Sequence, residues 1–129
     1  MNEIQVIHSD RAPKAVGPYS QAVKYAGLLY ASGQIGLVAE TGKLVTDDVE
    51  SQVRQVTKNL SAVLKEAGAD LTDILKVNIF LTDMGDFPQV NGIYAVWLKD
   101  HRPARATVAV AALPLGAKVE MDLIARLPE

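Results

Sequence analysis

The sequence predicts an α+β fold, in which six short strands form a sheet and two helices cover one side of it. Two segments repeat apolar residues every three to four positions, as amphipathic helices do, and the shorter apolar or alternating segments are typical of strands. The predicted order is β-β-β-α-β-α-β-β, which indicates an α+β sandwich. A chain of 129 residues fits one core, so we expect a single domain over residues 1–129.

The first three strands are predicted over residues 4–8, 22–25 and 28–37. The last two are separated by Ala26-Gly27, which favours a two-residue hairpin turn. Gly33 and Gly36 lie inside the third strand, and glycines there indicate either a bulge or the close approach of a ligand or another backbone. A Gly-Pro bend precedes Tyr19. The pattern fits a loop in which the tyrosine simply packs, and it also fits a bend that holds the tyrosine hydroxyl at a fixed angle.

The clearest helix is predicted over residues 49–67, with Asp47 or Asp48 as its N-cap and Gly68 after its end. Its apolar residues recur at a spacing of three and four and would face the core. Its other side is expected to face solvent and carries Gln52, Arg54, Lys58 and Lys65.

A second helix is predicted from near Asp86 to Leu98, with Pro88 in its first turn and Asn91 at the edge of its apolar stripe. Between the helices, residues 74–81 alternate between apolar and polar, as a strand covered mainly on one face does. The last two strands are predicted over residues 106–111 and 118–127. Both are apolar at nearly every position, which favours burial on both faces. Two helices can cover only one face, so we expect a homo-oligomer in which a neighbouring subunit covers the other.

Composition argues against several classes of function. With 13 Lys and Arg against 15 Asp and Glu, the net charge of −2 offers no basic field for nucleic acid. There is no cysteine, and His8 and His101 lack the spacing of metal ligands, so neither a metal site nor thiol chemistry is expected. No apolar run reaches the length of a membrane span and no secretion leader is recognised, so we expect a cytoplasmic protein.

The residues that point to chemistry are Arg105 and the carboxylates of the last strand. Alternation places Glu120 and Asp122 on one face and the aliphatic residues on the other. A carboxylate on a covered face needs a cation, and Arg105 is the natural candidate. A structural ion pair at an interface would explain this pattern. So would a site in which the arginine fork binds a substrate carboxylate and Glu120 activates a water molecule.

These residues also carry a resemblance. Arg102-Pro103-Ala104-Arg105, followed by Val119-Glu120-Met121, resembles the C-terminal signature of the RidA (YjgF/YER057c/UK114) family, and the likeness extends over essentially the whole chain. Supporting matches are Gly17-Pro18-Tyr19-Ser20, Ala31-Ser32-Gly33-Gln34-Ile35 and Val90-Asn91.

The resemblance implies a chorismate-mutase-like α+β fold with a mixed sheet, assembled as a homotrimer with sheets inside, helices outside and an active site in each cleft between subunits. It further implies a 2-iminobutanoate/2-iminopropanoate deaminase, which hydrolyses imino and enamino acids released by pyridoxal-phosphate dehydratases to 2-keto acids and ammonia, without a bound cofactor or metal. By similarity Arg105 would bind the substrate carboxylate and Glu120 would position water. The other residues lining the cleft would be Tyr19, Ser32, Gly33, Asn91 and Thr107.

Position 107 departs from the family pattern, because many deaminase members have Cys where this chain has Thr107. The contact there is expected to be largely through the main chain, so we expect a change of detail and not of reaction class. Two rival functions remain at this point. One is a non-catalytic regulatory trimer that binds carboxylate metabolites, and the other is a ribonuclease or translation inhibitor, for which the composition shows no basic excess.

Overall fold

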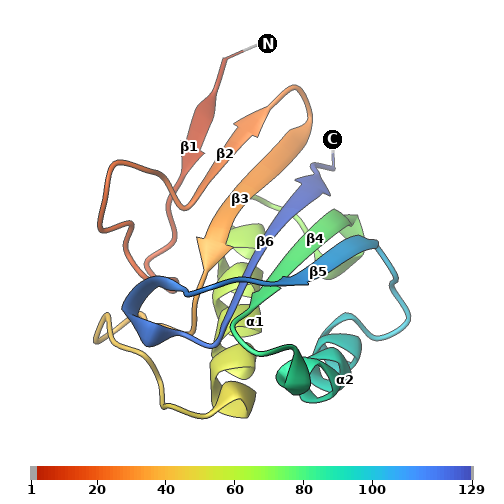
Figure 1. Cartoon of the computed structure of the whole chain (residues 1–129). Helices are drawn as coiled ribbons and strands as arrows, with labels where there is room; N and C mark the ends of the chain where they lie inside the picture. The colour runs from red at the N-terminus through yellow and green to blue at the C-terminus, as the bar shows by residue number, and fades with distance from the viewer. Residues whose placement is uncertain (1–2, 129) are drawn as a thin grey trace.

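The computed structural model describes residues 3–128, so Met1, Asn2 and Glu129 of the expected domain lie outside the described residues. It has the predicted α+β architecture (Figure 1). The strands are β1 (Gln5–Ile7), β2 (Ala22–Tyr25), β3 (Leu28–Gln34), β4 (Ile74–Leu81), β5 (Ala104–Ala109) and β6 (Val119–Arg126). The helices are α1 (Val49–Glu66) and α2 (Phe87–Leu98), and short 3₁₀ turns occupy Leu71–Asp73, Met84–Asp86 and Pro114–Gly116.

The strands form one mixed sheet in the order β1-β2-β3-β6-β4-β5. Every neighbouring pair is antiparallel except β4 and β5, which are parallel and are joined through α2. A parallel pair needs such a crossover, because a short hairpin cannot return the chain in the same direction. Figure 1 shows α1 behind β3 and β6, and the connection from β5 to β6 passing back across the sheet.

The core lies between the helices and one face of the sheet. From α1 it takes Val53, Val56, Leu60 and Val63, all with no exposed surface. On β6 the odd-numbered residues from Val119 to Ala125 are buried and the even-numbered ones are half-buried, which confirms the predicted alternation. Asp48 is the N-cap of α1 and accepts a hydrogen bond from the Ser51 amide. None of the helices within residues 3–128 combines the length and apolar character needed to cross a bilayer.

Two predictions are wrong, one about the end of β3 and one about Gln52 on α1, and the packing of the chain after β3 against α1 explains both. The strand predicted to reach residue 37 ends at Gln34, because the chain leaves the sheet there and packs against α1. Gln52, predicted to face solvent, is only 1 % exposed. Its side chain donates to the Thr46 carbonyl and accepts from the Lys118 amide, at 2.9 and 2.8 Å. The segment after β3 is itself held on α1 by Asn59, whose Nδ2 donates to the carbonyls of Ile35 and Leu37 at 3.3 and 2.9 Å, so polar side chains of the helix take the place of sheet pairing.

The other face of the sheet, which we call the open face, is not covered by either helix. It exposes aromatic and aliphatic side chains from β3, β4, β5 and β6, including Tyr30 at 42 % and Val108 at 45 % exposure, with Phe80 and Ile124 half-buried.

The predicted β5, over residues 106–111, is shifted two residues from the observed strand, because its pairing with β4 ends at Leu81 and Ala109. Burial of both faces of β5 and β6 therefore requires material from outside this chain.

Replacing Gly36 with alanine should destabilise the fold. A Cβ there would lie 3.0 Å from both the Cα and the carbonyl oxygen of Gln52, which are backbone atoms of α1. Since backbone cannot rotate away, we expect a loss of about 1–3 kcal/mol in the free energy of unfolding, measured by urea denaturation. The control is Gly92→Ala on the exposed side of α2, where no atom lies within 4 Å and stability should not fall. Equal stability of Gly36→Ala and the natural chain would contradict this packing.

Candidate functional site

Arg105 lies on β5 and points toward the helix side of the sheet. Its register partner on β4 is Val77, which is fully buried on that side. The Nη1 of Arg105 donates to Oδ1 of Asn91 at 2.7 Å. Its guanidinium carbon lies 5.4 Å from the ring centre of Phe87 and 5.0 Å from that of Tyr94, within cation–π range. The spacing of four and three between these α2 residues places all three on one helix face.

A cavity of about 540 Å³ surrounds this guanidinium, and we call it the Arg105 pocket. Its lining residues are Asn91, Tyr94, Ala95, Arg102, Pro103 and Arg105. Within residues 3–128, Asn91 is the only residue that accepts a hydrogen bond from Arg105. The remaining N–H groups form a planar fork that matches a carboxylate through two parallel hydrogen bonds. The pocket therefore has the size and the donors to hold a small organic acid.

Two buried hydroxyls on this side of the sheet have no hydrogen-bond partner among the described residues. They are the Tyr94 hydroxyl, whose ring lines the Arg105 pocket, and Oγ1 of Thr107, which lies on the same face of β5 as Arg105. Burial raises the pKa of Tyr94 above its usual value, with the nearby Arg105 charge opposing part of that effect. An unpartnered buried hydroxyl is costly, so a bound molecule that pairs with it gains affinity. Tyr94 was not among the site residues expected from the sequence.

Glu120 belongs to a second cavity, of about 290 Å³, which we call the Glu120 pocket. Tyr19, Gly33 and Glu120 lie in it together, with residues from the 13–16 loop and the 114–115 turn. A Cβ on Gly33 would lie 2.9 Å from Cδ of Glu120, so the missing side chain makes room for the carboxylate. Of the two predicted explanations for Gly33, the structure supports a bulge, because β3 has a register shift against β6 between Ala31 and Gln34.

The Glu120 carboxyl is held in an environment that favours its protonated form. Burial raises its pKa above the usual value, and the charge of Asp122, two residues along the same face, adds to that rise. Asp122 itself accepts a hydrogen bond from Nδ2 of Asn78 at 2.9 Å. A carboxylate with a raised pKa can exchange a proton nearer neutral pH than an exposed one can, which suits a general base.

Arg105 and Glu120 do not meet within one chain. Across the sheet Arg105 aligns with Val77 and then Leu123, which face the helices, whereas Glu120 aligns with Phe80 on the open face. Because neighbouring residues of a strand point to opposite faces, the two side chains leave opposite sides of the sheet. Within one chain Arg105 is therefore not the cation opposite Glu120 and Asp122, and the expected meeting of these groups in a cleft between subunits stays a prediction. The two groups can share one cleft only if different copies of the chain supply them.

Ser32 lies apart from both pockets. Its Oγ donates to the Ser20 carbonyl at 2.6 Å, and it lines a third, shallower cavity with residues of β2 and β3. The structure thus gathers the expected site residues into two sets, Tyr19, Gly33 and Glu120 in one and Asn91 and Arg105 in the other, with Thr107 on the face of Arg105. Ser32 has no place in either set within the single chain.

The chain is similar to known proteins over nearly its whole length. A family model described as Endoribonuclease L-PSP matches residues 9–127. A human protein named 2-iminobutanoate/2-iminopropanoate deaminase is 44 % identical over 121 residues, covering 94 % of this chain and 88 % of its own. An Arabidopsis thaliana protein named Reactive Intermediate Deaminase A, chloroplastic, is 49 % identical over 123 residues, covering 95 % of this chain and 66 % of its own.

Solved structures give the same picture. A Yersinia pestis protein, YyfA, described as a member of the Rid family, has 50 % identity and a TM-score of 0.95, and the match covers 97 % of this chain and all of that one. TdcF of E. coli, solved with bound serine, has 36 % identity and a TM-score of 0.91, with 96 % and 99 % of the two chains covered. These likenesses extend over the whole sheet and both helices.

Replacing Asp122 with asparagine should lower the pKa of Glu120, because it removes the neighbouring negative charge while the amide oxygen still accepts from Asn78. The measurement is a pH titration of the Glu120 carboxyl carbon by NMR. The matched control is Asp47→Asn, which removes a negative charge from the loop before α1 and should leave the pKa of Glu120 unchanged. An unchanged Glu120 titration in Asp122→Asn would mean that Asp122 does not contribute to the shift.

Proposed function

Because this chain belongs to the endoribonuclease L-PSP family, which includes the Rid proteins, we propose that it hydrolyses reactive 2-imino and 2-enamino acids to 2-keto acids and ammonia. The observation that carries the proposal is the Arg105 pocket. There a guanidinium is held by one amide and two aromatic rings while its other donors remain available for a small carboxylate. The relatives named as deaminases support the reaction class.

The proposed assembly is a homotrimer with one site at each subunit interface. Arg105 and Glu120 point from opposite faces of the sheet, so a complete site needs an Arg105 pocket from one subunit and a Glu120 pocket from the next. The apolar side chains of the open face supply a surface that association would bury. In this arrangement Asn91 and Thr107 come with Arg105, and Tyr19 and Gly33 come with Glu120. Ser32 would stabilise the Glu120 side through its bond to Ser20.

In the proposed reaction Arg105 binds the substrate carboxylate through two hydrogen bonds and fixes the adjacent C2 atom. An enamino acid first tautomerises to the imine, whose nitrogen is protonated in water. Glu120 accepts a proton from a water molecule as its oxygen bonds to C2, and then returns that proton to the nitrogen. The C–N bond breaks, ammonia leaves, and the remaining hydroxyl loses its proton to give the keto acid. The iminium carbon is already electrophilic, so we propose that no metal or cofactor takes part.

A second candidate function is binding of carboxylate metabolites without turnover. The structure of the relative TdcF holds bound serine, a carboxylate ligand that has no imine to hydrolyse. A turnover assay separates the two functions.

For the location of this protein in the cell we propose the cytoplasm. The Arabidopsis relative is named as a chloroplast protein.

The first test couples a threonine dehydratase to this protein and follows keto acid release from freshly formed 2-iminobutanoate. Faster release with the protein present is expected. Arg105→Ala should lower kcat/KM by about a hundredfold or more, the loss expected for a charged bidentate clamp. The control is Arg54→Ala, which removes an arginine from the exposed side of α1 and should keep full activity. No acceleration by the natural protein would favour the binding function.

The second test asks whether two subunits share each site. Arg105→Ala and Glu120→Gln are each inactive alone in the proposed mechanism. When the two are unfolded, mixed in equal amounts and refolded, about one quarter of interface sites should receive an intact Arg105 from one subunit and an intact Glu120 from the other. Activity near a quarter of the natural level is therefore expected. A mixture no more active than its two components would refute the shared site.

A third test concerns the space that Gly33 leaves for Glu120. Gly33→Ala should displace the carboxylate, because the new Cβ would overlap it, whereas the fold should tolerate the change since a side chain can move. We expect a loss of kcat of about tenfold or more with little change in thermal stability. Gly92→Ala serves again as the control. Full activity in Gly33→Ala would show that the position of the carboxylate is not critical.

A further inference from the structure

A further cavity, of about 560 Å³, lies between the loop after β1 and the outer side of α1 and shares no lining residue with the Arg105 or Glu120 pocket. We call it the basic pocket. Its lining residues are Ser9, Arg11, Lys58, Ser61, Ala62, Lys65 and Glu66. It lies on the helix side of the sheet, so covering the open face in an oligomer would leave it accessible.

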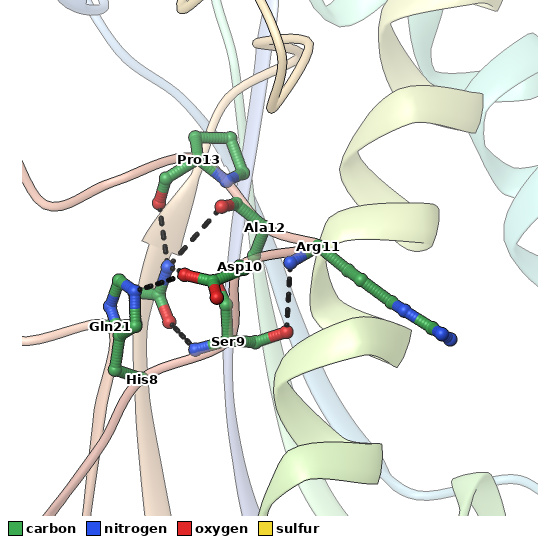
Figure 2. A network of polar contacts seen from close by, with 7 residues as sticks. All are labelled: His8, Ser9, Asp10, Arg11, Ala12, Pro13 and Gln21. Carbon is green, nitrogen blue, oxygen red and sulfur yellow. Dashed lines mark hydrogen bonds and ion pairs between the residues drawn. The ribbon is translucent and has the colours of Figure 1, made fainter.

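The loop that carries Arg11 is held in place by Gln21, which is 2 % exposed. Oε1 of Gln21 accepts from the Ser9 amide at 2.6 Å, and Nε2 donates to the carbonyls of Ser9 and Pro13 at 3.1 and 2.8 Å. Figure 2 shows this network, with the Arg11 side chain extending from the loop toward α1. One buried amide thus fixes the backbone on both sides of Arg11, so the arginine projects from a stable base.

The helix side of the basic pocket comes from one face of α1. Lys58, Ser61 and Lys65 are spaced by three and four, which places them in a row. Ala62 between them is small and leaves the space open. No carboxylate in the part of the chain that the structure describes forms an ion pair with Arg11, Lys58 or Lys65. Three cations therefore converge on one cavity in a chain whose net charge is −2, with Glu66 as the single acidic lining residue.

The hydroxyl oxygens of both serines in the basic pocket already accept a hydrogen bond. Oγ of Ser9 accepts from the Arg11 amide at 3.2 Å, and Oγ of Ser61 accepts from the indole Nε1 of Trp97 at 2.9 Å. A hydroxyl that already accepts a hydrogen bond keeps its own proton for a further partner. The pocket thus combines three positive charges with two hydroxyl donors, which is the chemistry that binds a compact anion with several acceptor oxygens.

We propose that the basic pocket binds a small phosphate-bearing anion, such as a phosphate monoester or a diphosphate. The arginine fork and two lysines suit the charge and the oxygen geometry of a phosphoryl group. A single-stranded nucleic acid is a poorer fit, because the lining has no aromatic side chain on which a base could stack. The proposal stands apart from the deaminase reaction, since none of these residues lines the Arg105 or Glu120 pockets.

The test measures thermal unfolding of the full chain against increasing pyrophosphate and inorganic phosphate, with ionic strength held constant by potassium chloride. A ligand that binds the folded state raises the midpoint in a saturable way. Arg11→Gln should weaken the pyrophosphate affinity by about tenfold, as loss of a bidentate donor does, and Lys65→Gln by about threefold, as loss of an exposed charge does. Lys43→Gln, which removes one lysine from a turn outside the pocket, should bind as the natural chain does.

Equal binding by the natural chain, Arg11→Gln and Lys65→Gln would overturn the proposal, and so would an equal loss in Lys43→Gln, since that would indicate non-specific screening. Should Arg11→Gln prove unstable, Lys65→Gln decides alone, because its side chain makes no described polar contact. Binding of an RNA oligonucleotide without any binding of phosphate or pyrophosphate would likewise overturn it, in favour of a polynucleotide surface. Keto acid formation measured on the same variants shows separately whether the deaminase proposal holds.

Discussion

Alternation of side chains across a β-sheet is the constraint on which the rest of this molecule depends. The register of β5, β4 and β6 sends Arg105 to the helix side, where Asn91 and two rings hold it, and sends Glu120 to the open face, where Gly33 gives it space. A cation and a carboxylate that could neutralise each other are thereby kept apart inside a subunit. The Arg105 guanidinium and the Glu120 carboxyl therefore both remain available to a bound molecule. If they formed an ion pair with each other, neither would be available.

The separation also accounts for the electrostatics of each half. The carboxyl of Glu120 is partly buried with the like charge of Asp122 nearby, and no arginine among residues 3–128 offsets these effects, so its pKa rises. The guanidinium of Arg105 faces aromatic rings and an amide oxygen, which orient it without cancelling its charge. The oriented guanidinium of Arg105 and the raised pKa of Glu120 are therefore properties of two different environments, each built from local contacts.

Much of the fold could be predicted from the sequence because it depends on local periodicity. The spacing of apolar residues located α1 and α2, and the alternation in the last strand placed Glu120 and Asp122 opposite the core. Gln52 was misplaced because its burial depends on a distant loop that packs over that side of α1. The meeting of Arg105 with Glu120 stays a prediction, since it depends on how two chains assemble and local periodicity does not specify that. Tyr94 was overlooked because a tyrosine at helical spacing is typical of a core.

The buried amide of Gln21 has a consequence beyond holding its own loop. On one side it fixes Ser9, which lines the basic pocket with Arg11. On the other it fixes Pro13, which lines the Glu120 pocket. The five consecutive residues from Ser9 to Pro13 therefore connect the basic pocket to the Glu120 pocket. If a ligand in one of these pockets changes the conformation of this segment, it also changes ligand binding in the other pocket. The coupling free energy is the same in both directions.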